Sequence, residues 1–255
     1  MTERMPVLFV GHGNPMNAIE DNEFSRAWIE VGRSLPPPKA ILCISAHWET
    51  EGTQVTAMEK PRTIHDFYGF PPELYAKTYP APGSPPLAER IRSLPGLTTS
   101  PDLEWGLDHG TWSVLARIFP NAGVPVVQLS LDVRKNPQEH YDAAKQLKNL
   151  RDEGVLIVGS GNIVHNLRLA VFQDRAYDWA IEFDETIEGL IQSDDHVSIV
   201  RYQELGKAAS LSVPTNEHYL PLLYVLALQD RQEQVRFFAQ GVTLGAISMR
   251  SLLIE

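Results

Sequence analysis

The sequence predicts an α/β fold with a largely parallel sheet whose two faces are covered by helices. Two observations predict it: short apolar runs rich in β-branched residues recur along the chain, and helical patterns fall between several of them. The 255 residues, of which 43% are hydrophobic, suffice for one large core. No linker, internal repeat or low-complexity segment divides the chain, so we expect a single domain over residues 1–255.

The strands are predicted where apolar residues run without polar alternation, which is typical of strands buried on both faces. Four such runs lie at residues 7–10, 40–45, 124–129 and 155–159. Weaker runs lie at residues 53–57 and 246–253.

Helices are predicted where apolar residues recur every three or four positions. Residues 21–35 show this spacing behind a capping residue, residues 136–154 begin with Asn-Pro and stop at a glycine, and residues 177–193 repeat the same spacing. A further helix is expected over "YLPLLYVLAL", residues 219–228.

Residues 61–86 have a different character from the rest of the chain. They hold seven of the 19 prolines and five aromatic residues, which are Phe67, Tyr68, Phe70, Tyr75 and Tyr79. Proline at this density excludes a regular helix or a central strand, so we expect a long, stiff loop. Such a loop is typical of a lid or binding wall, and equally of a segment packed over the core by its aromatic side chains.

The bulk composition excludes several function classes. There are 22 Lys and Arg against 32 Asp and Glu, and no basic run is interleaved with aromatics, so we expect no nucleic-acid partner. Cys43 is the single cysteine and lies in an apolar run, which excludes a disulfide framework and a thiolate metal site. No apolar stretch suits a signal peptide or a bilayer span, so we expect no membrane partner and a cytoplasmic location.

Three histidines follow predicted strands. His12 comes after the first strand in "VLFVGHGNP", His47 ends the strand in "CISAHWET", and His165 comes after the Gly-Ser-Gly turn in "VLIVGSGNIVHN". Ligands of open α/β sheets collect beyond the carboxyl ends of the strands. One loop histidine alone is more often a surface or capping residue, but three after three strands indicate a cluster.

His218, in "TNEHYLPLLY", is a fourth candidate. We expect it in the first turn of the helix over residues 219–228, with Thr215 or Asn216 as the cap. The helix dipole at this position disfavours an imidazolium and leaves the lone pair free for a cation.

A metal site in this chain needs His, Asp or Glu ligands, and His12, His47 and His218 are the best candidates. Glu217 is the carboxylate rival of His218. In place of His218 it would complete the face of two histidines and one carboxylate that is typical of non-haem Fe(II) oxygenases.

Five ordered motifs between residue 10 and about residue 224 resemble the class III extradiol ring-cleaving dioxygenases, specifically the 4,5-DOPA dioxygenase type. They are "GHGNP", "SAHWE", "IHDFYGFP", "LDHGTW" and "NEHYLPLL". The resemblance implies a three-layer α/β/α domain with a central mixed sheet and one mononuclear metal site. It also implies an enzyme that opens the ring of a catechol with O₂.

By the same resemblance, His12, His47 and His218 are metal ligands, and His165 is an acid/base that lies close enough to be a further ligand. His109, in "DHGTW", would face substrate and oxygen. The protocatechuate branch has a glutamate as third ligand, whereas three histidines leave more positive charge on the metal. Fe(II) is therefore expected in the active form, and Zn(II) stays open as the bound metal because three histidines also describe a zinc site.

The implied reaction needs a base that takes a hydroxyl proton from the catechol, after which a C–C bond next to the diol is cleaved. His165 suits this base because an imidazole with a pKa near about 6.5 accepts and returns protons at neutral pH. His109 would hydrogen-bond the oxygen or the substrate. The particular catechol and the oligomeric state are not specified by the sequence.

Two other functions stay open. One is a zinc hydrolase with the same ligands and His165 or Glu217 as base, and the other is a non-catalytic relative with a vestigial metal site. His109 could instead cap a helix over residues 111–119. His65 is expected to order the proline-rich loop through Asp66.

The remaining histidines, His140 and His196, lie in polar surroundings and are expected at the surface.

Overall fold

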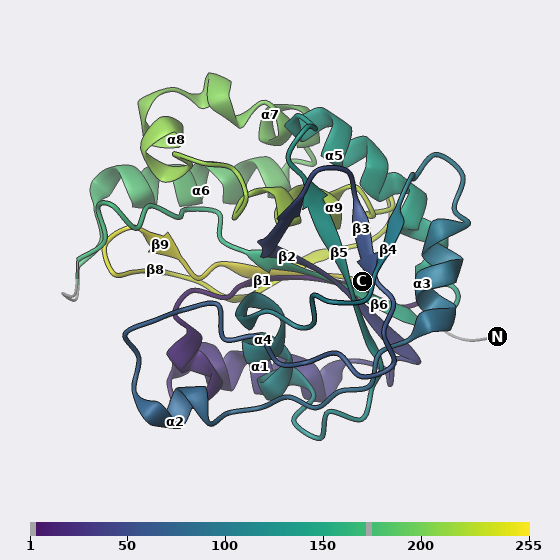
Figure 1. The fold of residues 1–255 in the computed structure, drawn as a ribbon. Coiled ribbons are helices and arrows are strands. Elements are labelled where there is room, and N and C mark those ends of the chain that lie inside the picture. Colours follow the sequence, from purple (N-terminus) through teal and green to yellow (C-terminus); the bar gives the residue numbers. More distant parts are fainter. Residues whose placement is uncertain (1–3, 172–174) are drawn as a thin grey trace.

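A computed structural model describes residues 4–171 and 175–255, and its centre is a mixed sheet of eight strands in the order β4-β3-β5-β2-β6-β1-β10-β7 (Figure 1). These strands are β1 (Val7–Gly11), β2 (Ala40–Thr50), β3 (Gln54–Thr56), β4 (Ser100–Asp102), β5 (Val126–Asp132), β6 (Val155–Gly161), β7 (Val235–Ala239) and β10 (Ser251–Ile254). The central strands β5, β2, β6 and β1 pair in parallel, whereas β10 pairs antiparallel with β1 and β7. The predicted α/β class with a mixed, largely parallel sheet is confirmed.

Helices cover both faces of the sheet and make three layers (Figure 1). One face carries α1 (Glu23–Ser34), α2 (Pro72–Tyr75), α4 (His109–Ile118) and the 3₁₀ helix η1 (Pro15–Ala18). The other face carries α3 (Pro85–Arg92), α5 (Pro137–Ala144), α6 (Asp178–Gln192), α7 (His196–Val200), α8 (Lys207–Ser212), α9 (Leu220–Leu226) and the 3₁₀ helices η2 (Lys145–Arg151) and η3 (Tyr202–Leu205).

The alternation of side chains along a strand explains why both faces are covered. In β1, Val7 and Phe9 lie in the apolar core under α5, α6 and α9, whereas Leu8 and Val10 lie in the core under α1 and α4. Successive side chains of a strand point to opposite faces, so a continuous apolar run needs a hydrophobic layer on each side.

The predicted helices are found, with changes at their ends. The helix predicted over residues 136–154 ends at Ala144 and continues as the 3₁₀ helix η2. Both α1 and α5 begin with a capping box, in which an asparagine at the N-cap accepts the N–H of the third helical residue. The start of α5 was thus predicted to within one residue, whereas its predicted end at residue 154 lies ten residues beyond Ala144.

Several predicted strand ends were wrong. The strand predicted from residue 124 begins at Val126, after Pro125, which has no backbone N–H to pair. The run over residues 246–253 divides into β9 (Ile247–Ser248) and β10, because β9 pairs with β8 (Val242–Thr243) in a separate two-stranded sheet. Strands β4, β7 and β8 were not predicted, since they are short or lie at edges.

The proline-rich residues 61–86 contain the single-turn helix α2 and the start of the regular helix α3, so the exclusion of a regular helix was wrong at the end of this segment. Both helices have proline in the first turn, where a missing N–H costs nothing. Within the described ranges, no helix is long and apolar enough to cross a membrane.

Candidate metal centre and active site

Three adjacent central strands deliver histidines to one edge of the sheet. His12 follows β1, His47 lies near the end of β2, and His165 follows β6. Because β1, β6 and β2 are parallel neighbours, their carboxyl ends meet at the same edge. The predicted cluster is present in the structure.

An irregularity in β2 aims His47 into the cluster. Ile44 pairs with Leu129 of β5 and Glu49 pairs with Leu131, so five steps along β2 match two along β5. Extra residues of this kind kink a strand and redirect a side chain at its end. His47 therefore leaves the regular pattern of the strand that precedes it.

The tautomer of His12 is set by Ser160. The Ser160 hydroxyl donates to the carbonyl of Gly110 at 2.5 Å, so its oxygen accepts from His12 Nδ1–H at 3.0 Å. His12 is 2% exposed. Its Nε2 atom therefore carries a free lone pair inside the molecule.

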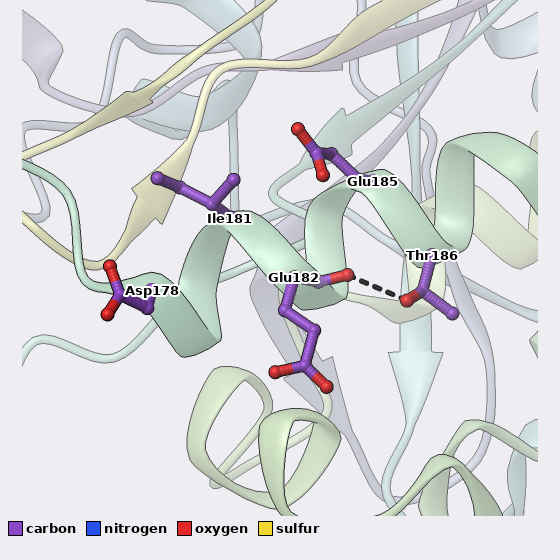
Figure 2. A pocket seen from close by; sticks show the side chains of 5 residues that line it. All are labelled: Asp178, Ile181, Glu182, Glu185 and Thr186. Carbon is purple, nitrogen blue, oxygen red and sulfur yellow. Dashed lines mark hydrogen bonds between the residues drawn. The ribbon is translucent and has the colours of Figure 1, made fainter.

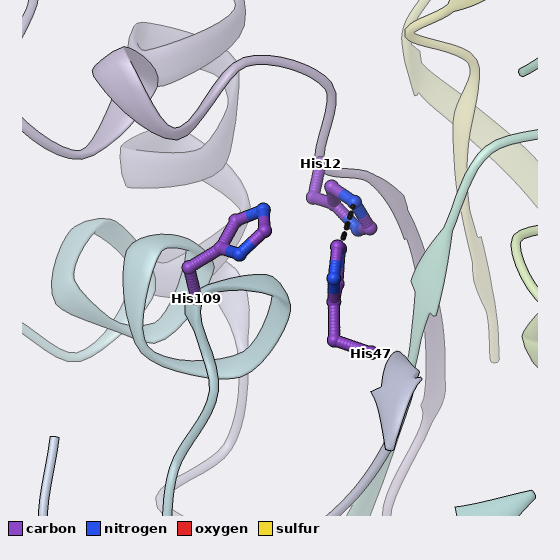
Figure 3. Close-up of side chains that lie close together, drawn as sticks. All are labelled: His12, His47 and His109. Atoms are coloured by element: carbon purple, nitrogen blue, oxygen red, sulfur yellow. Dashed lines mark hydrogen bonds between the residues drawn. The ribbon is translucent and has the colours of Figure 1, made fainter. Parts of the chain in front are cut away.

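His47 has the matching arrangement. Its Nδ1 lies 3.2 Å from Asp66 Oδ2, and its Nε2 lies 3.1 Å from Nε2 of His12 (Figure 3). If each Nδ1 atom carries the proton toward its neighbouring oxygen, the two Nε2 lone pairs face each other, which is unfavourable unless a proton or a cation lies between them. The pair has the donor atoms of a cation site.

The pKa values of the two rings move in opposite directions. Burial, and then the nearby histidines, hold the pKa of His12 well below its ordinary value. Burial also disfavours the charged form of His47, but the hydrogen bond to Asp66 and the charge of Asp108 outweigh it and raise its pKa.

His218 lies in the turn before α9, so the prediction that it occupies the first turn of that helix was wrong. The N–H groups of Tyr219 and Leu220 both donate to the carbonyl of Asn216, which forms a separate turn. Asn216 acts there through its backbone, and no side chain caps α9. The His218 ring centroid is 5.3 Å from that of His12 and 5.1 Å from that of His47.

Glu217 contacts His218 at the Nδ1 atom of the imidazole. Its Oε1 accepts from His218 Nδ1 at 3.0 Å and from the Thr215 hydroxyl at 3.0 Å. This contact makes Glu217 a hydrogen-bond partner of the imidazole in this structure. Burial and the neighbouring histidines hold the pKa of His218 well below its ordinary value.

His165 stacks on His218. The ring centroids are 3.4 Å apart with an interplanar angle of 8°. Burial lowers the pKa of His165 to about 4. His165, Glu217 and His218 also form a group whose ligand atoms lie within 4.8 Å of one another.

His109 is the first residue of α4, and Asp108, not His109, caps that helix by accepting the Thr111 N–H. The alternative role of His109 as a cap was therefore wrong. The His109 ring lies 3.9 Å from that of His47, and the ligand atoms of His12, His47 and His109 lie within 4.8 Å of one another (Figure 3). Burial, and then His47, lower its pKa.

Asp66 is the site residue that sequence reasoning missed, because it was considered only as support for the loop. Its Oδ2 lies 3.2 Å from His47 Nδ1 and 3.0 Å from His109 Nδ1. Burial raises the pKa of Asp66, but the contacts with His109 and His47 dominate and hold it well below its usual range. The signal in the sequence was the motif "IHDFYGFP".

The loop is anchored differently from the prediction. His65 Nε2 contacts the carbonyl of Lys77 at 2.9 Å and so orders the loop without Asp66. Phe67 meets His109 edge-on at 5.5 Å, whereas Tyr68 is 92% exposed. The proline-rich loop is thus both a wall of the site and a segment packed by its aromatic side chains.

Besides His65, two histidines lie apart from the cluster, and the prediction of a surface position was wrong for His140. It is buried, with Nδ1 3.1 Å from the Tyr224 hydroxyl. His196 is partly buried, and its Nδ1 lies 2.8 Å from the Tyr141 hydroxyl.

A cavity of about 200 Å³ lies against the cluster, beside His165. It is lined by His165, Asn166, Leu167, Arg168, Pro214, Thr215 and Glu217. A more open hollow of about 580 Å³ lies along α6 and is lined by Asp178, Ile181, Glu182, Glu185 and Thr186 (Figure 2). No histidine is among the residues that line the α6 hollow, whereas His165 lines the smaller cavity.

A model of the family described as the catalytic LigB subunit of aromatic ring-opening dioxygenase matches residues 7–248. This chain belongs to the LigB family. Among LigB-type relatives, a 4,5-DOPA dioxygenase extradiol of Escherichia coli (strain K12) is 47% identical over 258 residues, which covers 98% of this chain and 95% of the relative. A 4,5-DOPA dioxygenase extradiol of Beta vulgaris is 39% identical over 223 residues, covering 84% and 83%.

A crystal structure of an uncharacterized protein from Escherichia coli K12 matches this fold with a TM-score of 0.86 and 43% identity. It covers 99% of this chain and 100% of that one. The LigB-family chain is therefore an enzyme of the extradiol, ring-opening dioxygenase class, and the predicted enzyme class is confirmed. Its buried histidine cluster provides donors for the metal that such an enzyme needs.

Proposed function

We propose that this LigB-family enzyme opens the ring of a catechol, DOPA or a close analogue, with O₂ as co-substrate. In this proposal Fe(II) is held by His12, His47 and His218. One observation supports this proposal most directly. The Nδ1 atoms of the three imidazoles lie next to oxygens of Ser160, Asp66 and Glu217, respectively, which leaves Nε2 of each ring to bind the metal.

The donor set fits a divalent transition metal. Neutral imidazoles suit Fe(II) and Zn(II). The single thiol, that of the buried Cys43, accepts a hydrogen bond from the Thr111 hydroxyl and is not part of the donor set. When bound, Fe(II) would supply Lewis acidity and coordination positions for the two catechol oxygens and for O₂. Zn(II) would fit the same three nitrogens in purified protein.

His165 is proposed as the acid/base. Burial lowers its pKa to about 4, below the value of about 6.5 expected from the sequence, so the ring is neutral at physiological pH and can accept the catechol hydroxyl proton, although as a weaker base than a free imidazole. Its place at the cavity, stacked on His218, puts it at the boundary between the donor set and the substrate space. The same ring can return the proton to the product.

His109 is proposed to face the substrate. His109 lies in the first turn of α4, its ring lies next to that of His47, and the Phe67 ring is nearly perpendicular to it. Asp66 lies against Nδ1 of His109, which leaves Nε2 for a hydrogen bond to substrate or oxygen. The aromatic loop and α4 would together exclude water from that side of the ring.

Oxygen uptake tests this function. Protein purified anaerobically and loaded with Fe(II) is challenged with DOPA, protocatechuate and larger catechols in an oxygen electrode. We expect one O₂ consumed per catechol and a coloured ring-opened product. No uptake from protein that holds one iron per chain would overturn the catechol assignment, and oxygen-independent ester or amide cleavage by the zinc form would favour the hydrolase.

A further inference from the structure

Asp66 contacts two histidines with different proposed tasks. Its Oδ2 lies 3.2 Å from Nδ1 of His47 and 3.0 Å from Nδ1 of His109. Its Oδ1 accepts the backbone N–H of His109 at 2.8 Å. One carboxylate therefore connects the end of β2 with the first residue of α4.

The backbone around Asp66 holds the carboxylate in place. The Ile64 N–H donates to the carbonyl of Leu107 at 2.7 Å, and the Leu107 N–H donates to the carbonyl of Arg62 at 2.8 Å. The Trp112 indole N–H donates to the carbonyl of Ile64 at 2.7 Å. The loop is thus bonded to the segment that carries His109 on both sides of that histidine.

The other two proposed ligands have partners of their own. Ser160 accepts from His12, and Glu217 accepts from His218. Asp66 differs from these two partners because it contacts both His47 and His109. A rotation of either imidazole would therefore disturb the oxygen that orients the other. The side chain of Asp66 is 20% exposed, so most of it is shielded from water.

We propose that Asp66 is a positioning residue that fixes His47 and His109 as one unit, and thereby couples the metal ligand to the imidazole that faces the substrate. This inference deepens the proposed function and rests on it for the roles of the two histidines. In this proposal Asp66 Oδ2, 3.2 and 3.0 Å from the two Nδ1 atoms, keeps the proton of both rings on Nδ1 and the lone pair on Nε2 in the metal-free protein. A partner of this kind is generally worth about 10- to 100-fold in metal affinity.

Asp66→Asn is the informative change because it keeps the size of the side chain. The amide oxygen can still accept the His109 N–H, while the amide NH₂ group replaces the acceptor shared by the two rings. At least one ring must then turn or move its proton to Nε2. We expect cation affinity to fall roughly 10- to 100-fold.

The first measurement is calorimetric titration of the full-length, metal-free protein with Zn(II) or Co(II), without substrate. Asp66→Asn is compared with Glu217→Gln, which alters a partner of His218 alone, and with Glu73→Gln, an exposed carboxylate on α2 in the same loop. We expect weaker binding in the first two variants and unchanged binding in Glu73→Gln. Wild-type affinity in Asp66→Asn would overturn the inference.

The second measurement is ¹⁵N NMR of the imidazoles in metal-free protein at mildly alkaline pH. We expect Nδ1–H signals for His47 and His109 in wild type, with both altered in Asp66→Asn and only His218 altered in Glu217→Gln. Nε2–H signals for both rings in wild type would overturn the inference without any variant. This readout therefore decides the matter even where Asp66→Asn lacks native near-UV circular dichroism.

Different outcomes would exclude the metal site and the positioning role of Asp66. Wild-type protein that binds no divalent cation would remove the metal site and, with it, the coupling. Wild-type protein that binds the cation and opens catechols, with Asp66→Asn unchanged in affinity and in NMR signals, would remove only the role of Asp66.

Discussion

Gly161 and His218 approach each other so closely that a Cβ atom on Gly161 would lie 2.1 Å from the His218 carbonyl oxygen. The same carbonyl accepts the N–H of Asn162 at 2.8 Å, and the Gly161 carbonyl accepts the N–H of His12 at 3.1 Å. The end of β6 therefore touches the backbone of two proposed ligands and sets the space between them.

Gly161→Ala should move the turn that carries His218. Such an overlap with backbone forces a shift, and overpacking of this kind costs about 1–3 kcal/mol of unfolding free energy. We expect that loss in urea unfolding, together with at least a roughly tenfold loss of Zn(II) affinity by calorimetry. Gly189→Ala is the matched control, because a Cβ there meets nothing within 4 Å on the exposed side of α6, and Ala at that helical position should stabilise slightly. Equal affinities in the two variants would contradict the argument.

His47→Ala should abolish cation binding and turnover together, since it removes a proposed ligand and the partner of Asp66. Metal content after dialysis and oxygen uptake report the two losses on the same sample. His196→Ala, remote from the cluster, should leave both unchanged. Turnover retained by His47→Ala would show that this histidine is not a ligand.

His165→Ala should lower turnover while leaving most of the metal affinity. Because His165 is proposed to move a proton, we expect turnover with saturating Fe(II) to fall about 10²–10⁴-fold. Metal affinity should change far less than in His47→Ala. Full activity at neutral pH would remove the acid/base role, and complete loss of metal would instead make His165 a ligand.

The buried His140 predicts a pH dependence of stability. Burial lowers its pKa to about 4 in the folded state, whereas the unfolded value is about 6.5. The unfolded chain therefore binds the proton first as pH falls, so stability decreases between about pH 6.5 and pH 4 and does not depend on this group above that range. Relative to pH 8, the loss from His140 at pH 5 is roughly 2 kcal/mol.

Urea unfolding of metal-free protein at pH 8 and at pH 5 measures this loss. His140→Gln keeps a polar side chain near the Tyr224 hydroxyl and removes the titration. The variant should therefore lose less stability than wild type over the same interval, while the other histidines contribute equally to both. An identical loss in the two proteins would show that His140 titrates alike in both states.

The sheet and the histidine cluster were predictable because their signals are local. An apolar run such as residues 7–10 specifies a buried strand, and a histidine just after such a strand must lie at its carboxyl end. His12 and His47 followed from this rule alone.

Asp66 and His140 were not predictable because long-range contacts place them. Asp66 is placed at the cluster by hydrogen bonds between its loop and the distant segment around Leu107, such as that of the Ile64 N–H to the Leu107 carbonyl, and His140 lies against Tyr224 of α9. Edge strands such as β4, with the sequence Ser-Pro-Asp, have no pattern of their own and form where a partner strand offers hydrogen bonds.

The proposed ligands come from distant parts of the chain, since His12 follows the first strand and His218 lies 206 residues later in the sequence. A cation held by both would act as a non-covalent cross-link and raise the unfolding free energy by mass action, about 2.7 kcal/mol at 100 times its dissociation constant. Chelators should therefore lower the melting temperature of the whole molecule. During synthesis, the complete donor set would exist only after residue 218 has left the ribosome.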